Sequence, residues 1–281
     1  MNTICFWKTE TIGNDFVLVR LEDVQGLDFS DLAVELCERR FAIGSDGLLV
    51  VAPTPFGISL RMFNPDGTED FCGNGLRCAG WHAQLEGWVG SSFEILHGGR
   101  MIQTEVSGGG RVSITLPPAD FNPGAVPVVS PHEMIGQSVY GLVGTAVSTG
   151  SAHFVALVEK LPGDKEFHST SPKIETDKLF PEHISVIYTQ EVGPAHLKLR
   201  IWERSVGETL GCGTGSVAAA VVWARKCGFG GEVKVSNPGG DLIVRLRDWQ
   251  SPVVSESRPN RVYEGTVQIP VAVVVNGASL V

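Results

Sequence analysis

An internal duplication is the feature that most constrains this chain. A shift of 140 residues, half of the 281-residue sequence, superposes cysteines, alanines and glycines in register. The matched pairs are Gly67 and Gly207, Cys72 and Cys212, Gly73 and Gly213, Gly75 and Gly215, Ala79 and Ala219, and Gly99 and Gly239. Self-similarity of this kind indicates repeated structural units. We therefore expect two similar domains.

Short apolar runs bounded by Gly, Pro or Asn dominate both halves, and such runs predict strands. They cover residues 16–19, 48–51, 58–63, 111–116, 154–158, 197–202, 232–235, 242–246 and 266–275. Helical periodicity is rarer, and it predicts helices over 29–40, 76–85 and 216–226, the first with Asp28 or Ser30 as its cap. Strands therefore outnumber helices.

These patterns predict an α+β fold of two pseudo-symmetric domains, each a mostly antiparallel sheet wrapped around a central helix. The central helices are 76–85 and 216–226. Residues 117–124 contain three prolines and no periodicity, which is typical of a linker. We expect domain one to comprise residues 1–118 with 266–281, and domain two residues 119–265.

Composition excludes several classes of protein. Lys and Arg number 22 against 31 Asp and Glu, a net charge of −9, which disfavours nucleic acid as a partner. No apolar run approaches the roughly 20 residues of a membrane span, and the first residues lack signal-peptide anatomy. Six cysteines without C-x-x-C spacing indicate neither a disulfide scaffold nor a zinc site. We expect a cytoplasmic protein without a metal.

Each half carries Cys-Gly-x-Gly at the expected start of its central helix, at Cys72 and at Cys212. A helix start has unpaired backbone N–H groups and a partial positive charge, so it binds anions and lowers the pKa of a thiol. Glycines allow a ligand to approach the backbone. Two such units around one cleft suit the removal of a proton from one face of a carbon and its return to the other.

Long motifs in order along the chain resemble the diaminopimelate epimerase family, cofactor-independent epimerases of lysine and peptidoglycan precursor synthesis. The residues that carry the resemblance are 13–16, 39–47, 64–67, 72–78, 203–215 and 263–265. The resemblance implies a small amino acid substrate, no cofactor, and neither nucleic acid nor membrane as a partner. It leaves a homodimer open.

The resemblance also implies roles for individual residues. Cys72 and Cys212 match the family's catalytic pair, a thiolate base and a thiol acid. His153 and Glu203 match residues proposed to assist their proton transfers. The backbone of the residues after each cysteine matches the site of the reacting carboxylate: Gly73, Asn74, Gly213 and Thr214. Asn14, Asn64 and Arg204 match substrate-binding positions, the last two at the distal end of the ligand.

Two departures fall at that distal end. The family usually has Gly-Asn-Pro-His where this chain has Gly150-Ser151-Ala152-His153, and an asparagine where this chain has Ser185. Either waters replace the two amides and diaminopimelate is converted from its LL to its meso form, or a racemase or epimerase acts on a different amino acid. A third hypothesis, a redox protein that joins Cys72 and Cys212 in a switching disulfide, does not explain two glycine-lined anion sites.

Overall fold

The structure is a computed structural model that describes residues 2–269. It divides into two compact units: unit 1 comprises residues 2–114 and 258–269, and unit 2 comprises residues 115–257. The first boundary lies inside strand β7 (Arg111–Leu116), before the prolines of the expected linker. The last strand begins at Asn260, earlier than expected, and residues 270–275 of its expected course lie outside the described residues.

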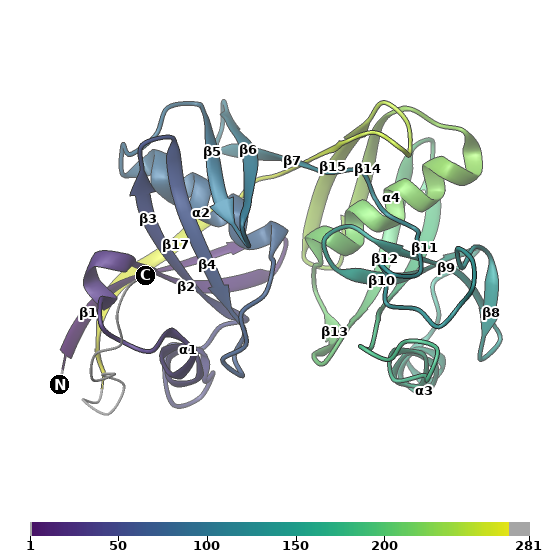
Figure 1. The fold of residues 1–281 in the computed structure, drawn as a ribbon, viewed down its shortest axis with the longest axis horizontal. Helices are drawn as coiled ribbons and strands as arrows, with labels where there is room; N and C mark the ends of the chain where they lie inside the picture. The colour runs from purple at the N-terminus through teal and green to yellow at the C-terminus, as the bar shows by residue number, and fades with distance from the viewer. Residues whose placement is uncertain (1, 270–281) are drawn as a thin grey trace. The chain divides into compact units, whose positions relative to one another are not determined.

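Among the described residues, the sheet of unit 1 has the strand order β17, β1, β2, β3, β4, β5, β6, β7 (Figure 1). Neighbours run antiparallel except for β2 with β3 and β4 with β5. The strands other than β7 are β1 (Asn2–Thr11), β2 (Asn14–Arg20), β3 (Gly47–Thr54), β4 (Gly57–Phe63), β5 (Ser92–His97), β6 (Arg100–Ser107) and β17 (Asn260–Ile269).

Helix α2 (Gly73–Leu85) contacts β17 and every strand from β1 to β6, so the sheet of unit 1 wraps around it. The helix is buried along most of its length: Leu76, Ala79 and Ala83 have no exposed surface, and Arg77 and His82 are buried with them. Gly80 permits the close approach, because a Cβ there would lie 3.3–3.5 Å from side chains of β5, β6 and β7.

Helix α1 (Phe29–Cys37) covers the other face of the unit 1 sheet, after the short helix η1 (Leu21–Val24). Its Leu32 and Leu36 join the core cluster of Val17 and Val19, which alternate along β2 with residues facing the opposite side. Asp28 is the N-cap, as expected, and its carboxylate accepts from the backbone of Ser30 and Asp31.

Among the described residues, the unit 2 strands follow the order β8, β9, β10, β11, β12, β14, β15, β16, with β13 paired to one end of β12. Again two neighbouring pairs are parallel, β10 with β11 and β12 with β14. The strands are β8 (Gln137–Val139), β9 (Leu142–Ser148), β10 (Ala152–Val158), β11 (Ser185–Gly193), β12 (His196–Glu203), β13 (Gly207–Thr209), β14 (Gly231–Asn237), β15 (Gly240–Leu246) and β16 (Val253–Ser257).

Helix α4 (Gly213–Cys227) is the central helix of unit 2 and contacts β9 to β12 and β14 to β16. It ends at Gly228, whose φ of 65° is the left-handed conformation that favours glycine. Helix α3 (Asp164–Glu175) packs on the outer side, where Phe167 and Ile174 join a core with Phe154 and Tyr188. The sequence patterns did not predict α3.

The two units have the same strand order and the same parallel pairs, each around one helix that begins after a cysteine. The expected pseudo-symmetric α+β fold is confirmed. Within residues 2–269, no helix is long and apolar enough to cross a membrane.

Asp28→Ala should lower the free energy of unfolding by about 1 kcal/mol, because two backbone N–H groups at the start of α1 lose their acceptor. Urea denaturation measures the change. Asp31→Ala is the matched control, since Asp31 lies in the same turn but accepts neither bond, and it should cost only a few tenths of a kcal/mol. Equal losses in the two variants would contradict the assignment of the cap.

Candidate active site

Cys72 is the N-cap residue of α2. Its backbone is extended, with φ −135° and ψ 109°, and its Sγ accepts from the backbone N–H of Gly75 at 3.4 Å. The side chain is half-buried. The sulfur therefore lies at the positive end of the helix dipole, where unpaired backbone donors are concentrated.

Cys212 occupies the same position on α4. Its φ of −121° and ψ of 112° match those of Cys72, and its Sγ accepts from Gly215 N at 3.3 Å. The Thr214 hydroxyl lies 3.5 Å from the same sulfur. Cys212 is buried, with 5% of its surface exposed. The two cysteines are therefore equivalent in backbone geometry but differ in burial.

Glycine gives the closest packing at the third residue after each cysteine. A Cβ on Gly75 would lie 2.9 Å from Leu49 Cδ2, and one on Gly215 would lie 2.8 Å from Ile187 Cδ1 and 3.1 Å from the sulfur of Cys212. A side chain at either position would therefore displace the end of Leu49 or Ile187. The repeated glycine thus lets strand β3 or β11 pack directly against the first helical turn while the sulfur caps it.

Burial raises the pKa of the Cys212 thiol well above its usual range, and the negative charge of Glu203 raises it further. Hydrogen bonds from Thr214 and Gly215 act in the opposite direction but are weaker. The sequence-based expectation of a lowered pKa is wrong for Cys212, because loss of solvent outweighs the helix dipole. Cys212 is a protonated thiol at neutral pH.

Glu203 ends strand β12 and is held by a neighbouring strand. The hydroxyl of Thr209, on β13, donates to Glu203 Oε1 at 2.6 Å. Because β13 pairs antiparallel with the end of β12, Gly207 faces Glu203 and Thr209 lies two residues further on. This short hairpin orients the carboxylate that acts on Cys212.

His153 lies on β10 opposite Ser185 of β11 and is completely buried. Burial, with a smaller effect of the Arg204 charge, lowers the pKa of His153 to about 3, so the imidazole is neutral at pH 7. Neither ring nitrogen has a hydrogen-bond partner among the described residues. His153 thus carries an unused donor and an unused acceptor.

Ser185 contributes to the backbone around Arg204. Its hydroxyl oxygen accepts from Arg204 N at 3.1 Å, and the Arg204 guanidinium donates to the carbonyl of Glu182 at 3.2 Å. Ser151 is half-buried in the turn before β10, where its carbonyl accepts from Thr149 N at 3.1 Å. The Thr149 hydroxyl in turn donates to Thr214 O at 2.9 Å, a contact that no sequence pattern indicated.

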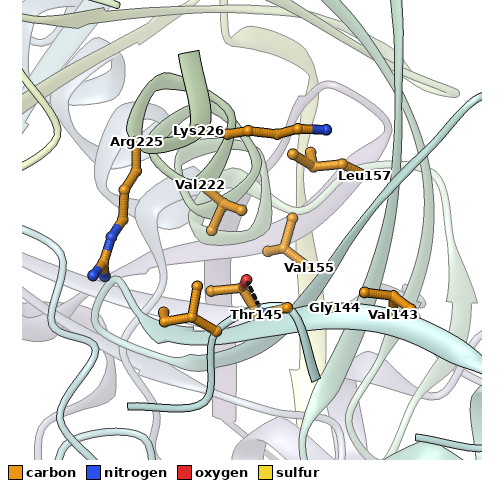
Figure 2. A pocket seen from close by; sticks show the side chains of 10 residues that line it. Val143, Gly144, Thr145, Val155, Leu157, Val222, Arg225 and Lys226 are labelled. Carbon is orange, nitrogen blue, oxygen red and sulfur yellow. Dashed lines mark hydrogen bonds between the residues drawn. The ribbon is translucent and has the colours of Figure 1, made fainter. Parts of the chain in front are cut away.

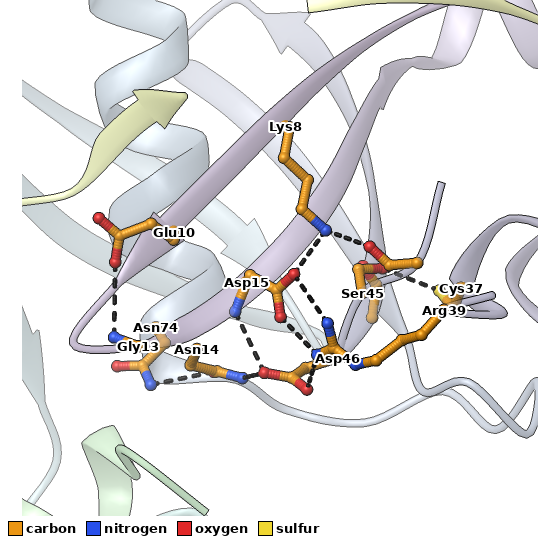
Figure 3. A network of polar contacts seen from close by, with 12 residues as sticks. Lys8, Glu10, Gly13, Asn14, Asp15, Cys37, Arg39, Ser45, Asp46 and Asn74 are labelled. Atoms are coloured by element: carbon orange, nitrogen blue, oxygen red, sulfur yellow. Dashed lines mark hydrogen bonds and ion pairs between the residues drawn. The ribbon is translucent and has the colours of Figure 1, made fainter. Parts of the chain in front are cut away.

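In unit 1 a chain of hydrogen bonds joins Asn74 to Asn14 (Figure 3). Arg77 donates to Asn74 Oδ1, Asn74 Nδ2 donates to Asn14 Oδ1 at 3.0 Å, and Asn14 Nδ2 donates to Asp46 Oδ2 at 2.8 Å. A guanidinium only donates and a carboxylate only accepts, so the two ends of this chain fix the orientation of both amides. Asp46 and Arg77 thus hold two candidate site residues, and the sequence patterns did not single them out.

A second cluster supports the Asp46 end of that chain (Figure 3). Asp15 pairs with Lys8 and Arg39, and Arg39 also donates to Asp46 Oδ1 at 2.6 Å. Burial opposes ionisation of Asp15, but the hydrogen bonds from Arg39 and Lys8 outweigh it and hold the pKa of this carboxyl below its usual range. The loop 39–46 is therefore tied to the start of β2.

Asn64 follows β4 in a tight turn, where it bonds to Thr68. Its amide donates to Thr68 Oγ1 at 3.0 Å, and its backbone N–H donates to Thr68 O at 2.8 Å. In unit 1 the structure thus joins Asn14 and Asn74 directly. In unit 2 it joins Cys212 with Thr214, and Ser185 with Arg204.

Unit 2 also contains a largely apolar pocket of about 390 Å³ between the last turn of α4 and strands β9 and β10 (Figure 2). Val155, Leu157 and Val222 line it, with Arg225 and Lys226 beside them. None of the residues discussed above lines this pocket. Within residues 2–269, no group of three or more His, Cys, Asp or Glu side chains is arranged to hold a metal ion.

A family model described as diaminopimelate epimerase matches residues 6–119 and 145–264. Curated relatives with that name include one from Pelotomaculum thermopropionicum, 37% identical over 85% of this chain and 90% of its own length. Another, from Methanothrix thermoacetophila, is 39% identical over 87% of this chain and 89% of its own length.

Solved structures share the fold at lower identity. A phenazine biosynthesis protein from Bacillus anthracis has a TM-score of 0.68 at 19% identity, covering 96% of this chain and 100% of its own. A hydroxyproline epimerase from Agrobacterium vitis, solved with bound trans-4-hydroxy-L-proline, has a TM-score of 0.67 at 13% identity, covering 95% of this chain and 91% of its own.

Glu203→Gln should accelerate alkylation of Cys212, because removal of a negative charge lowers the pKa of the thiol. At a pH below the pKa of the thiol, each decrease of one pKa unit makes the fraction of Cys212 present as thiolate about tenfold larger. Mass spectrometry of iodoacetamide-treated protein between pH 7 and 9 measures the rate at this residue. Glu208→Gln, a neighbouring carboxylate on β13 that pairs with Arg200, is the control and should leave the rate unchanged. An unchanged or slower rate in Glu203→Gln would contradict this account.

Proposed function

Because the chain belongs to the diaminopimelate epimerase family, and is thus an isomerase, we propose that it inverts one Cα of LL-diaminopimelate to give the meso form without a cofactor. The observation that carries the proposal is the equivalence of Cys72 and Cys212. Each caps the central helix of one of two equivalent units, with the same backbone conformation and the same Sγ contact to the third residue after it.

In the proposed reaction one cysteine acts as a thiolate base and takes the Cα proton, and the other acts as a thiol acid on the opposite face. The first sulfur ends protonated and the second deprotonated, so the reverse reaction uses the same groups with exchanged roles. The raised pKa of Cys212 supports its role as the acid in the free enzyme, and Cys72 is then the base.

The starts of α2 and α4 supply the proposed binding site for the reacting carboxylate. Removal of a proton from Cα places negative charge on that carboxylate. Hydrogen-bond donors that contact the carboxylate therefore lower the barrier to proton removal. The backbone N–H groups of Gly73, Asn74, Gly213 and Thr214 lie in the first helical turns, where the dipole favours an anion.

Proton return to the resting state requires a group that exchanges protons with the buried sulfur. Glu203 is the side chain best supported for Cys212, because its carboxylate acts on that sulfur and is held by Thr209. His153 is a neutral, buried imidazole with both nitrogens unused, which supports a role as a hydrogen-bonding group that assists proton transfer, while its lowered pKa disfavours a role as the proton acceptor itself.

Asn14, Asn64, Ser151, Ser185 and Arg204 are the proposed substrate-binding side chains. Arg204 has a guanidinium suited to a carboxylate, which supports a ligand with a second amino acid head. Ser151 and Ser185 are shorter than the family's asparagines, and this favours the second candidate function, epimerisation of a different amino acid. We place the protein in the cytoplasm, where its six free cysteines would stay reduced. A homodimer stays open as its assembly.

Cys72→Ala and Cys212→Ala should each abolish inversion, because each removes the proton carrier on one face of Cα. The measurement is conversion of one stereoisomer into the other, followed by chiral chromatography, across a panel of amino acids that includes diaminopimelate. Cys78→Ala is the matched control: Cys78 is buried on the same helix, burial raises its pKa to about 12, and its loss should leave the reaction intact. Loss of activity on changing Cys78 alone, with Cys72→Ala active, would show that the wrong base has been assigned.

The double substitution Ser151→Asn with Ser185→Asn restores the family's amides. If diaminopimelate is the native substrate, its KM should change by no more than about tenfold, the scale of one hydrogen bond. If another amino acid is native, the double change should impair its turnover and raise activity on diaminopimelate. If the wild-type protein does not act on diaminopimelate but the double variant does, the proposed substrate is wrong. The two-cysteine mechanism would not be contradicted by that result.

A further inference from the structure

The backbone of Cys72 is held by a histidine from a distant part of unit 1. Cys72 N donates to His97 Nε2 at 3.1 Å, and His97 Nδ1 lies 3.0 Å from the carbonyl oxygen of Leu60. A carbonyl oxygen only accepts, so Nδ1 carries the ring proton, and Nε2 offers the lone pair that Cys72 N–H requires. Both partners thus specify one neutral tautomer.

The ring of His97 has no freedom to leave this position. It is 2% exposed and ends strand β5, which pairs with β4 so that His97 lies opposite Leu60. Phe71, the residue before Cys72, stacks on the ring with centroids 5.0 Å apart and planes inclined by 24°. His97 therefore joins the end of β5 rigidly to the segment that leads into α2.

Cys72 is consequently anchored at two points. His97 fixes its backbone N–H, and Gly75 N–H fixes its sulfur. The two contacts lie on either side of the Cα–Cβ bond of Cys72. Together they determine the direction in which the sulfur points, because neither the backbone nor the side chain can rotate without losing one of them.

The equivalent position in unit 2 has different chemistry. Asn237 ends β14 as His97 ends β5, and the 140-residue shift matches the two. Asn237 accepts from the Ser216 hydroxyl at 2.9 Å, in the first turn of α4. Its amide does not titrate, whereas the ring that holds the Cys72 backbone gains a proton in acid.

We propose that His97 is a positioning residue for Cys72, and that protonation of its Nε2 releases the Cys72 backbone and turns the sulfur away from its reacting direction. The role of Cys72 in this inference rests on the proposed function. His97 does not act on substrate. It acts through the backbone of the residue that does.

Burial opposes protonation of His97, and the charges that face the ring favour it without outweighing burial. Burial lowers the pKa of His97, whereas the Leu60 carbonyl and the carboxylates of Glu69 and Asp70, in the turn before α2, favour the charged ring. Glu69 is itself paired with Arg61 of β4. Because the folded-state pKa is below the unfolded value of about 6.5, the neutral ring and its bracing are present above that pH and are lost as pH falls through the folded pKa.

Two variants and two readouts test the proposal. His97→Leu removes both ring nitrogens, and His97→Gln keeps an amide that can accept from Cys72 N but does not titrate. His168→Gln, on the exposed side of α3, is the control. The first readout is kcat and KM for Cα exchange between pH 5 and 8, and the second is the rate of iodoacetamide alkylation at Cys72 and Cys212, resolved by mass spectrometry.

His97→Leu should lower kcat by about tenfold to a hundredfold, the range expected when a buried N–H donor is left without its acceptor, with KM within about threefold of wild type. It should change the pH profile of alkylation at Cys72 and leave that of Cys212 unchanged. His97→Gln should recover most of kcat. Its profile of kcat against pH should lack the part of the decrease in acid that comes from titration of His97. The control should match wild type.

The proposal is overturned if His97→Leu matches wild type in both readouts, or if His97→Gln retains the wild-type acid limb. It is also overturned if both variants are equally impaired while circular dichroism shows an intact fold. The alkylation readout does not depend on catalysis. If wild type exchanges no amino acid, the proposed function fails, and alkylation of Cys72 still decides the role of His97.

Discussion

Enclosure of a helix by a sheet on nearly all sides is the constraint on which the rest of this structure depends. Strands of the same unit surround helices α2 and α4, so the lateral surfaces of both helices are committed to the core. Only the ends of an enclosed helix remain for polar chemistry, and the N-terminal end carries the unpaired donors. A cysteine at that end lies beside the unpaired donors and the positive end of the helix dipole, as Cys72 and Cys212 do.

The two units have equivalent strands and central helices, but the side chains around their cysteines differ. In unit 1, helix α2 contains the buried Arg77. The 140-residue shift matches this arginine with Val217 of α4. In unit 2 the carboxylate of Glu203 raises the pKa of the sulfur instead. In the proposed mechanism this asymmetry gives the resting proton a preferred position, because identical surroundings would give the two thiols the same pKa.

Much of the fold follows from the sequence, because the duplication and the apolar runs are local signals. The central helices were expected three residues late, since Gly73 and Gly213 carry no helical signal of their own. Helix α3 was missed because it contains Pro172 and a polar stretch, and its Phe167 and Ile174 become meaningful only against the core they meet. The raised pKa of Cys212 and the contact between His97 and Cys72 depend on residues distant in sequence, so no local pattern could indicate them.

The pairing of β17 with β1 has a consequence for the order in which the chain acquires structure. These strands contain opposite ends of the described chain, and Asn2 lies opposite Ile269. In unit 2 the equivalent edge position belongs to β8, which immediately precedes β9. Unit 2 is thus a continuous segment with local connections, whereas the sheet of unit 1 is incomplete until its last strand leaves the ribosome. During synthesis the second half of the duplication can therefore finish folding before the first.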